Sequence, residues 1–472
     1  MSREPTPAGE TDPATGAATD GESIHGVDPA TDSRADYDYA GDGVERPNLV
    51  SALAARVDGD VRFDTYSRQL YATDASVYQQ LPIGVVAPAS TADVAAVMGY
   101  CADREIPVLP RGGGTSLAGQ AVNEAVVLDF KRHMDGFLGV DPEEGTARAQ
   151  PGITLATLDD HLRPHGLKYA PDPAWGDKSV LGGCIGNNST GAHSLKYEKA
   201  DGYVESVEAV LADGTVTTFG WVDVDDLDDL AAGAGADGGR GDHGDGGSGE
   251  VDLEARIYAE VRRILDEEAE EIEARYPDLT RNVSGYNLDR LVADAREHGQ
   301  VNVGRLLAGS EGTLAIVTEA EVSLEPIPET TAVVMLTYDG VLPAMRDVAP
   351  ILEHDPSAVE VMDDVFLDLA RETGEFADLV ATLPDGTDST LLVEFYAESD
   401  REARQKVADL LADRLPDYEP AVDPHESAAG TTDDPVNAVD ALEAYDADRQ
   451  AEFWKMRKAG LPILLSRTGD EK

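Results

Sequence analysis

The stretch that decides the fold is RGGGTSLAGQ at residues 111–120, which follows an apolar segment at 106–109 with the pattern of a strand. Glycines permit positive φ angles and close backbone approach, so the amide N–H groups of such a loop can line up on an anion. Thr115, Ser116 and Gln120 add side-chain donors. The loop lacks both the Gly-Lys-Ser/Thr ending of a Walker A loop and the spacing of a Rossmann fingerprint, so it predicts another kind of phosphate site.

The segments around this loop follow the order of an α/β nucleotide-binding unit. Residues 91–106 have helical apolar spacing with Thr91 as the predicted N-cap, and AVVLDF at 125–130 has the composition of a strand. A strand, a helix, a strand and a glycine loop in succession indicate half of an α/β nucleotide-binding domain.

Two further glycine clusters follow along the chain. The first is PDPAWGDKSVLGGCIGNNSTGAHS at 171–194, and the second is LAGSEGTLAIVT at 307–318. In the first, glycines again permit close backbone contact, and Asn187, Asn188 and Ser189 supply polar side chains. Three such loops, each next to a predicted strand, indicate several walls of one site for a large ligand that carries phosphates.

These motifs, in this order and at roughly this spacing, resemble the FAD-binding domain of the vanillyl-alcohol-oxidase superfamily, the PCMH-type flavoproteins. Within it they are most similar to the branch of the glycolate oxidase D-subunit, D-lactate dehydrogenase and D-2-hydroxyglutarate dehydrogenase. The similarity covers about residues 48–327 and continues more loosely beyond them. It implies an α+β fold: a two-subdomain PCMH-type FAD-binding domain followed by a partial α+β substrate (cap) domain.

The resemblance also assigns residues to the cofactor. The backbone of loop 111–120 would hold the FAD pyrophosphate, the second cluster would line the flavin and its ribityl chain, and the third would lie beside the ring system. The residues implied are Arg111, Gly112, Gly113, Gly114, Thr115, Ser116, Gly119, Gln120, Pro171, Gly182, Gly183, Asn188, Gly191, Gly309, Gly312 and Ile316.

Three positions depart from the family pattern. Thr115 stands where relatives that attach flavin covalently often have His, so we expect non-covalent FAD. Thr190 and Ala315 stand where many relatives have Gly, which weakens the assignment of single neighbouring residues.

The resemblance makes Arg457, in FWKMRK at 453–458, the expected partner of the substrate carboxylate. The chemistry suits this role because a guanidinium presents a bidentate fork that Lys cannot. Lys472 aligns with a family lysine near the same site, but it is the last residue. Relatives continue into a His-rich stretch with metal ligands and a catalytic His. We therefore expect a chain that stops before its active site is complete, with the catalytic base unknown and no metal site.

Composition divides the chain further. Residues 1–46 are rich in Asp, Gly, Ala, Thr and Pro, which predicts a disordered acidic tail. We expect the FAD-binding domain at 47–327, with an Asp/Gly low-complexity insert at 221–250 on its surface. Residues 328–472 alternate strands and helices and are expected to form an incomplete substrate domain.

Charge and cysteine content exclude several partners. Lys and Arg number 37 against 92 Asp and Glu, a net charge of −55, which disfavours nucleic acid and anionic membranes and is typical of a saline, halophilic cytoplasm. Two cysteines cannot hold a four-thiolate iron–sulfur cluster. The N-terminus has no apolar signal region, and no apolar run is long enough to cross a membrane, so a cytoplasmic protein is expected.

The resemblance therefore predicts an FAD-dependent dehydrogenase that oxidises D-lactate, glycolate or D-2-hydroxyglutarate to the 2-oxo acid by hydride transfer to flavin N5. Electrons would pass to an iron–sulfur module or a quinone-linked acceptor. One alternative is a non-catalytic FAD-binding or electron-relay subunit of a larger complex. Another is an enzyme acting on aromatic alcohols, but an aromatic content of 6% disfavours it.

Overall fold

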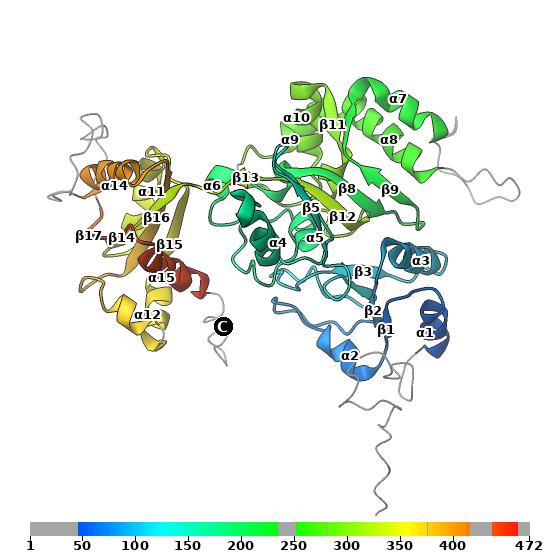
Figure 1. The fold of residues 1–472 in the computed structure, drawn as a ribbon, viewed down its shortest axis with the longest axis horizontal. Helices are drawn as coiled ribbons and strands as arrows, with labels where there is room; N and C mark the ends of the chain where they lie inside the picture. The colour runs from blue at the N-terminus through cyan, green and yellow to red at the C-terminus, as the bar shows by residue number, and fades with distance from the viewer. Residues whose placement is uncertain (1–45, 235–251, 280, 375, 416–436, 461–472) are drawn as a thin grey trace, which may run out of the picture.

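The structure is a computed structural model, and it describes residues 46–234, 252–279, 281–374, 376–415 and 437–460. The expected acidic tail at 1–46 lies outside these residues except for Arg46, and Lys472 lies outside them as well. The chain forms an N-terminal half, residues 46–326, and a C-terminal half, residues 330–460, which lie side by side along the long axis (Figure 1). Among the described residues, no helix combines the length and hydropathy needed to cross a bilayer.

The first sheet confirms the predicted α/β unit. Its strand order is β1 (Asp60–Arg62), β2 (Gly84–Ala87), β4 (Val126–Asp129) and β3 (Val108–Arg111), with β2, β4 and β3 parallel. Helix α3 (Thr91–Ala102) connects β2 to β3, and α1 (Pro47–Ala54) and α2 (Thr65–Leu70) flank the sheet. Every residue of β2 is buried, as parallel strands covered on both faces require.

One local prediction is wrong. Ser90, rather than Thr91, caps helix α3, because Ser90 has extended backbone angles and its Oγ accepts from the Asp93 amide at 3.3 Å. The Thr91 hydroxyl instead donates to Glu208 at 2.7 Å, on a strand of the next sheet. The sequence offers two adjacent cap residues, and in the structure the second of them contacts a residue 117 positions away.

The second sheet is antiparallel, in the order β5 (Phe137–Asp141), β6 (Thr146–Ala149), β12 (Ile316–Ser323), β8 (Val204–Val210) and β9 (Val216–Phe219). The hairpin of β8 and β9 turns at Gly214, whose φ of +89° suits glycine. Buried side chains of this sheet form one core with helices α4 (Leu155–Leu162), α5 (Leu181–Gly186), α8 (Leu253–Arg263) and α10 (Leu288–His298). This sheet and its helices are the second subdomain.

Residues 221–250 were expected to be a low-complexity excursion, and their first part is ordered instead. Strand β10 (Trp221–Asp223) pairs with β11 (Gln300–Asn302), and helix α7 (Leu227–Leu230) packs on α8. The reason is that Leu227 is fully buried in the core and the indole of Trp221 donates to Glu205. Residues 235–250 lie outside the described residues.

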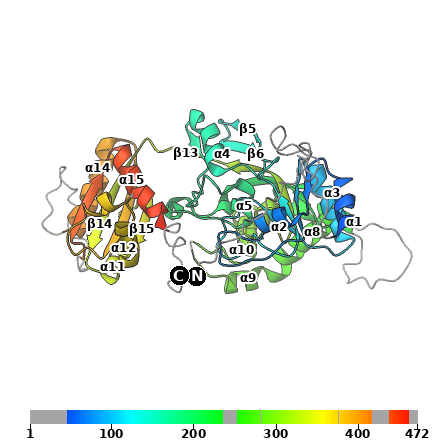
Figure 2. The same ribbon diagram turned by 90° about the horizontal axis from the view of Figure 1, so that it is seen from below.

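The C-terminal half is built on one antiparallel sheet, in the order β15 (Ala358–Met362), β16 (Ser389–Ala397), β14 (Thr330–Tyr338) and β17 (Asp440–Ala444). Successive residues of β14 face opposite sides, so Val334 packs toward helices α11 (Val341–Leu352) and α14 (Asp400–Arg414). Val333 packs toward α12 (Asp364–Glu372) and α15 (Ala447–Lys458). The predicted α+β architecture is therefore confirmed. Helix α15 lies on the side nearest the N-terminal half (Figures 1 and 2).

Candidate functional site

The three glycine loops meet around one cavity of about 500 Å³ in the N-terminal half. Loop 111–120 follows β3, residues 182–190 run through α5 and beyond it, and residues 307–317 lead into β12. The predicted cofactor residues that line the cavity are Arg111, Gly112, Gly113, Gly114, Thr115, Ser116, Gln120, Gly182, Gly183, Asn188, Gly312 and Ile316. Gly119, Pro171, Gly191 and Gly309 are not among the lining residues, although each belongs to one of the three motifs.

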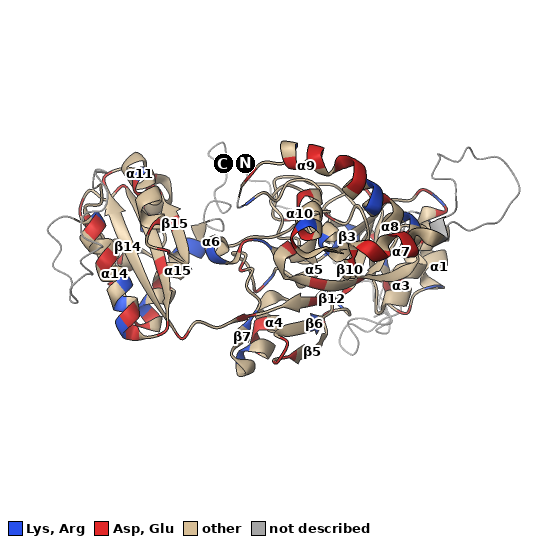
Figure 3. Ribbon diagram, turned by 90° about the horizontal axis from the view of Figure 1, so that it is seen from above, with Lys and Arg blue, Asp and Glu red and all other residues tan. Residues whose placement is uncertain are grey.

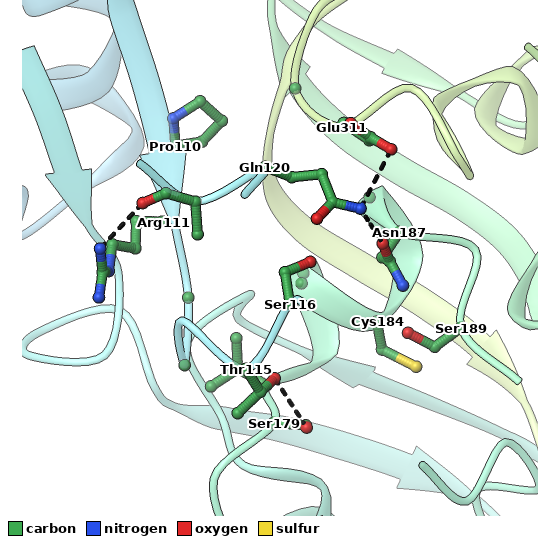
Figure 4. A pocket seen from close by; sticks show the side chains of 18 of the residues that line it. Pro110, Arg111, Thr115, Ser116, Gln120, Ser179, Cys184, Asn187, Ser189 and Glu311 are labelled. Atoms are coloured by element: carbon green, nitrogen blue, oxygen red, sulfur yellow. Dashed lines mark hydrogen bonds between the residues drawn. The ribbon is translucent and has the colours of Figure 1, made fainter. Parts of the chain in front are cut away.

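One side-chain amide joins all three loops inside the cavity. Nε2 of Gln120 donates to Oδ1 of Asn187 at 3.0 Å and to Oε1 of Glu311 at 3.3 Å (Figure 4). Oε1 of Gln120 is buried and has no protein partner among the described residues. The residue assignments drawn from the sequence did not include Asn187 and Glu311, although both lie within the quoted motifs.

Two glycines show why these loops carry no side chains. A Cβ on Gly113 would stand 2.2 Å from the backbone oxygen of Lys178. On Gly191 it would stand 1.9 Å from the backbone oxygen of Asp172. Atoms do not approach so closely, so the packing of these loops requires glycine at both positions.

The side chain of Arg111 braces the first loop. Its guanidinium donates to the backbone oxygens of Tyr71, Thr73 and Ala121 at 3.2, 2.7 and 2.8 Å. These bonds connect the loop to residues 71–73. Burial lowers the pKa of Arg111, although the negative charge of nearby Asp74 acts to raise it. The guanidinium thus fixes the shape of the loop while the loop backbone faces the cavity.

A cluster of polar and aromatic side chains joins the two halves beside this cavity. His193, just beyond the second glycine loop, places Nε2 2.7 Å from an oxygen of Glu394 on β16 and Nδ1 3.3 Å from Asp172. We call the following residues the interdomain cluster: Lys168, Asp172 and His193 from the N-terminal half, and Glu394, Tyr396, Trp454 and Lys458 from the C-terminal half.

The strand register explains why the cluster forms. Leu392 of β16 packs toward α12 and α15, and Glu394 and Tyr396 share its face because side chains alternate along a strand. Glu394 is 5% exposed, so its charge needs partners within the protein. A single acidic residue in the apolar strand STLLVEFYA was the available sequence signal for this site.

Arg457 lies on α15 but does not line the cavity. Its Nε donates to Glu360 of β15 at 2.8 Å, and the guanidinium forms an ion pair with the same carboxylate at 2.5 Å. The guanidinium group that was expected to bind a substrate carboxylate is therefore already paired with a carboxylate of the protein. Within the described ranges, no group of three or more His, Cys, Asp or Glu is placed to hold a metal ion.

Comparison with known proteins identifies the two halves. Residues 82–220 match the family described as "FAD binding domain", and residues 327–472 match "FAD linked oxidases, C-terminal domain". Both halves therefore match domains of the FAD-linked oxidase family. FAD is the cofactor of this family, and the predicted fold and cofactor are both confirmed.

Several curated relatives match most of this chain. It is 32% identical over 369 residues to D-2-hydroxyglutarate dehydrogenase of Pseudomonas putida, which covers 76% of this chain and 35% of that protein. It is 29% identical to the glycolate oxidase subunit GlcD of Bacillus subtilis, covering 72% of this chain and 57% of that one. It is 28% identical to D-lactate dehydrogenase of Archaeoglobus fulgidus, covering 69% and 57%. The chain thus spans about a third of the length of the first of these relatives.

A solved structure shows the same fold. Alkyldihydroxyacetonephosphate synthase superposes with a TM-score of 0.55 over 90% of this chain and 65% of that one, at 18% sequence identity. At this level of identity the likeness concerns the fold alone, and it spans both halves.

The chemistry of the cavity fits a flavin dinucleotide. Glycines supply much of its lining, and the buried Oε1 of Gln120 has no donor among the described residues, so a ligand can supply one. Among the described lining residues there is no His or Tyr, and burial raises the pKa of the Cys184 thiol there to about 11. A thiol at that pKa is protonated and unreactive at neutral pH.

Proposed function

We propose that this chain is the FAD-binding and substrate-gathering part of a dehydrogenase that oxidises a small D-2-hydroxy acid to the 2-oxo acid. The observation that carries the proposal is the single cavity formed by the three glycine loops, bridged by Gln120, beside a C-terminal half whose helix α15 carries Arg457. The relatives named for D-2-hydroxyglutarate, glycolate and D-lactate support this class of substrate.

Within this proposal the loops divide the cofactor between them. The amides of loop 111–120 would bind the pyrophosphate, the residues around Gly182 and Asn188 would hold the flavin and ribityl portion, and Gly312 and Ile316 would flank the ring. Bound FAD supplies the acceptor for the hydride from C2 of the acid. The protein binds and orients the reactants, and the walls keep water from the ring.

The substrate side rests on Arg457. Its fork binds the carboxylate of the acid, which must displace Glu360 from the same guanidinium. The hydroxyl proton passes to a base that we do not assign to a residue of this chain. Bound FAD, once reduced, would pass two electrons to an iron–sulfur module or a quinone-linked acceptor.

We further propose non-covalent FAD, because the lining residue at the family's attachment position is Thr115, whose hydroxyl lies 3.1 Å from that of Ser179. A net charge of −55 favours a saline cytoplasm as the compartment, since mobile ions screen the self-repulsion of such a protein.

A second candidate is an FAD-binding or electron-relay subunit that oxidises no substrate. The ion pair of Arg457 with Glu360 favours it, because the expected substrate ligand is already occupied. Under this candidate FAD binds in the same cavity, and no hydroxy acid reduces it.

The test is an anaerobic titration of the flavin-loaded protein in high salt with D-lactate, L-lactate, glycolate and D-2-hydroxyglutarate, following the flavin band near ~450 nm. Bleaching by a D-acid or glycolate, with no bleaching by L-lactate, is the expected result. A loaded protein that none of these acids bleaches supports the second candidate. Acid release of the flavin into the supernatant tests the non-covalent mode.

A further inference from the structure

His193 lies between two carboxylates of opposite halves. The Nε2 contact with Glu394 is 2.7 Å, the Nδ1 contact with Asp172 is 3.3 Å, and the imidazole side chain is 13% exposed. A neutral imidazole has one donor and one acceptor nitrogen, so it can satisfy only one of two ionised carboxylates, whereas an imidazolium satisfies both. Nδ1 lies within ion-pair distance of Asp172 without forming a hydrogen bond, and the place of the ring between two carboxylates favours its positively charged form.

The electrostatic surroundings agree with this protonation. Burial lowers the pKa of His193, but the hydrogen-bonding and charge interactions with Asp172 and Glu394 outweigh it and raise the pKa to about 9. For Asp172, burial raises the pKa, and His193 and Lys458 together lower it below its ordinary value. The cluster thus holds a buried positive charge between two negative ones.

The other charged groups near His193 do not take over its two contacts with Glu394 and Asp172. Lys168 from β7 (Leu167–Lys168) donates to the Tyr396 hydroxyl at 3.3 Å, and Lys196 of α6 (Ser194–Tyr197) lies over the same ring. Lys458 lies 3.7 Å from Asp172 and is a weaker partner at that distance. Helix α6, whose one basic residue is Lys196, lies beside the C-terminal half (Figure 3).

The same carboxylate also holds helix α15. Nε1 of Trp454 donates to Oε1 of Glu394 at 3.1 Å, and the hydroxyl of Ser357 donates to Oε2 at 2.9 Å. The imidazole of His193 lies 5.3 Å from the Trp454 ring. The position of α15, and of Arg457 three residues beyond Trp454, is therefore tied to the glycine loop through Glu394 and His193.

We propose that His193, as an imidazolium, is a positioning residue that docks the C-terminal half on the second glycine loop and so sets the place of α15 beside the flavin cavity. The docking itself is independent of turnover. Its consequence for catalysis rests on the proposed function, because the consequence arises only if Arg457 binds the substrate.

The direct experiment measures docking without any enzymatic readout. Single cysteines replace Asp160, an exposed residue of α4, and Arg401, an exposed residue of α14, and carry spin labels for a distance distribution. The native Cys101 and Cys184 are buried. We expect one narrow distance at pH 6.5 that broadens as the pH rises through about 9, and a broad distribution at every pH for His193→Gln.

Two further variants separate charge from structure. His193→Arg keeps a positive charge and two directions for donation and should restore the narrow distance without the pH dependence. His165→Gln, an exposed histidine of the same half, is the matched control and should behave as the parent protein. A narrow, pH-independent distance in His193→Gln overturns the proposal.

Catalysis supplies the second readout. If acids reduce the flavin, His193→Gln should raise KM for the acid at least roughly tenfold near neutral pH, and His193→Arg should recover most of it. An unchanged KM with altered docking leaves the docking proposal standing and contradicts the role given to Arg457. If no acid reduces the flavin, the proposed function is contradicted. The docking proposal is not, because the label distances do not depend on turnover.

Discussion

The amide of Gln120 and the amide oxygen of Asn187 meet at 3.0 Å inside the cavity, although 67 residues separate them along the chain. The same Gln120 nitrogen reaches Glu311, so one side chain fixes the spacing of three loops that come from both subdomains. A dinucleotide site assembled from distant loops needs such a bridge, because each loop alone is a flexible glycine turn.

Replacing Gln120 with Leu should therefore weaken FAD binding. The variant removes both bonds and the free Oε1 while keeping a similar volume, and the loss of two neutral or charge-assisted bonds corresponds to about 1–3 kcal/mol, or roughly tenfold or more in Kd. Titration of apoprotein with FAD by flavin fluorescence measures it. Gln300→Leu, which removes an exposed bond to Asp223, is the control and should leave Kd unchanged.

Replacing Glu360 with Gln should lower KM for the hydroxy acid. The ionised Glu360 competes for the guanidinium of Arg457, and an amide competes far less for a cation. Arg457→Lys should raise KM, because Lys has no bidentate fork. Steady-state kinetics with an artificial acceptor tests both, and Arg449→Lys on the same helix serves as control because its partner Glu452 is exposed. A higher KM in Glu360→Gln contradicts the role given to Arg457.

Asp159 gives a prediction for stability and pH. Burial raises the pKa of Asp159 to about 6, against a hydrogen bond from the Tyr169 amide that lowers it. An acid whose pKa is raised on folding binds more protons when folded, so stability falls as the pH rises from about 4 through about 6. Asp159→Asn removes this loss and should stabilise the protein at pH 8 by about 1 kcal/mol.

The neighbouring residue offers the control for this prediction. The side chain of Asp160 is 75% exposed, so Asp160→Asn should leave the unfolding free energy within about 0.5 kcal/mol of the parent value. Urea unfolding at pH 4, 6 and 8 compares the three proteins. Equal stability of Asp159→Asn and the parent protein at pH 8 would contradict the raised pKa.

Much of the N-terminal half could be predicted because its signals are local. A run of glycines after a strand requires a loop open to a ligand, and the three motifs lie in the order that the family resemblance implies. The strand alternation from residue 331 onward was equally local, and it gave the architecture of the C-terminal half.

The contacts between distant residues could not be predicted in the same way. The contact between His193 and Glu394 spans 201 residues, and the bond between Arg457 and Glu360 spans 97. Each depends on which face a strand presents, and that face follows only from the register of the sheet. The ordered part of the acidic insert was missed for a related reason, since one buried Leu227 outweighs the polar composition around it.

The central claim is that the three glycine loops form the FAD site of this chain, and one binding measurement tests it most directly. Apoprotein in high salt is titrated with FAD alongside Gly113→Val, whose Cβ would clash with the backbone oxygen of Lys178 and so displace the first loop, and Gly202→Ala, where a Cβ meets no neighbouring atom. Saturable binding of one FAD per chain by the parent and Gly202→Ala, with binding lost in a folded Gly113→Val, is the predicted result. No binding by the parent protein, or equal binding by Gly113→Val, would contradict the account.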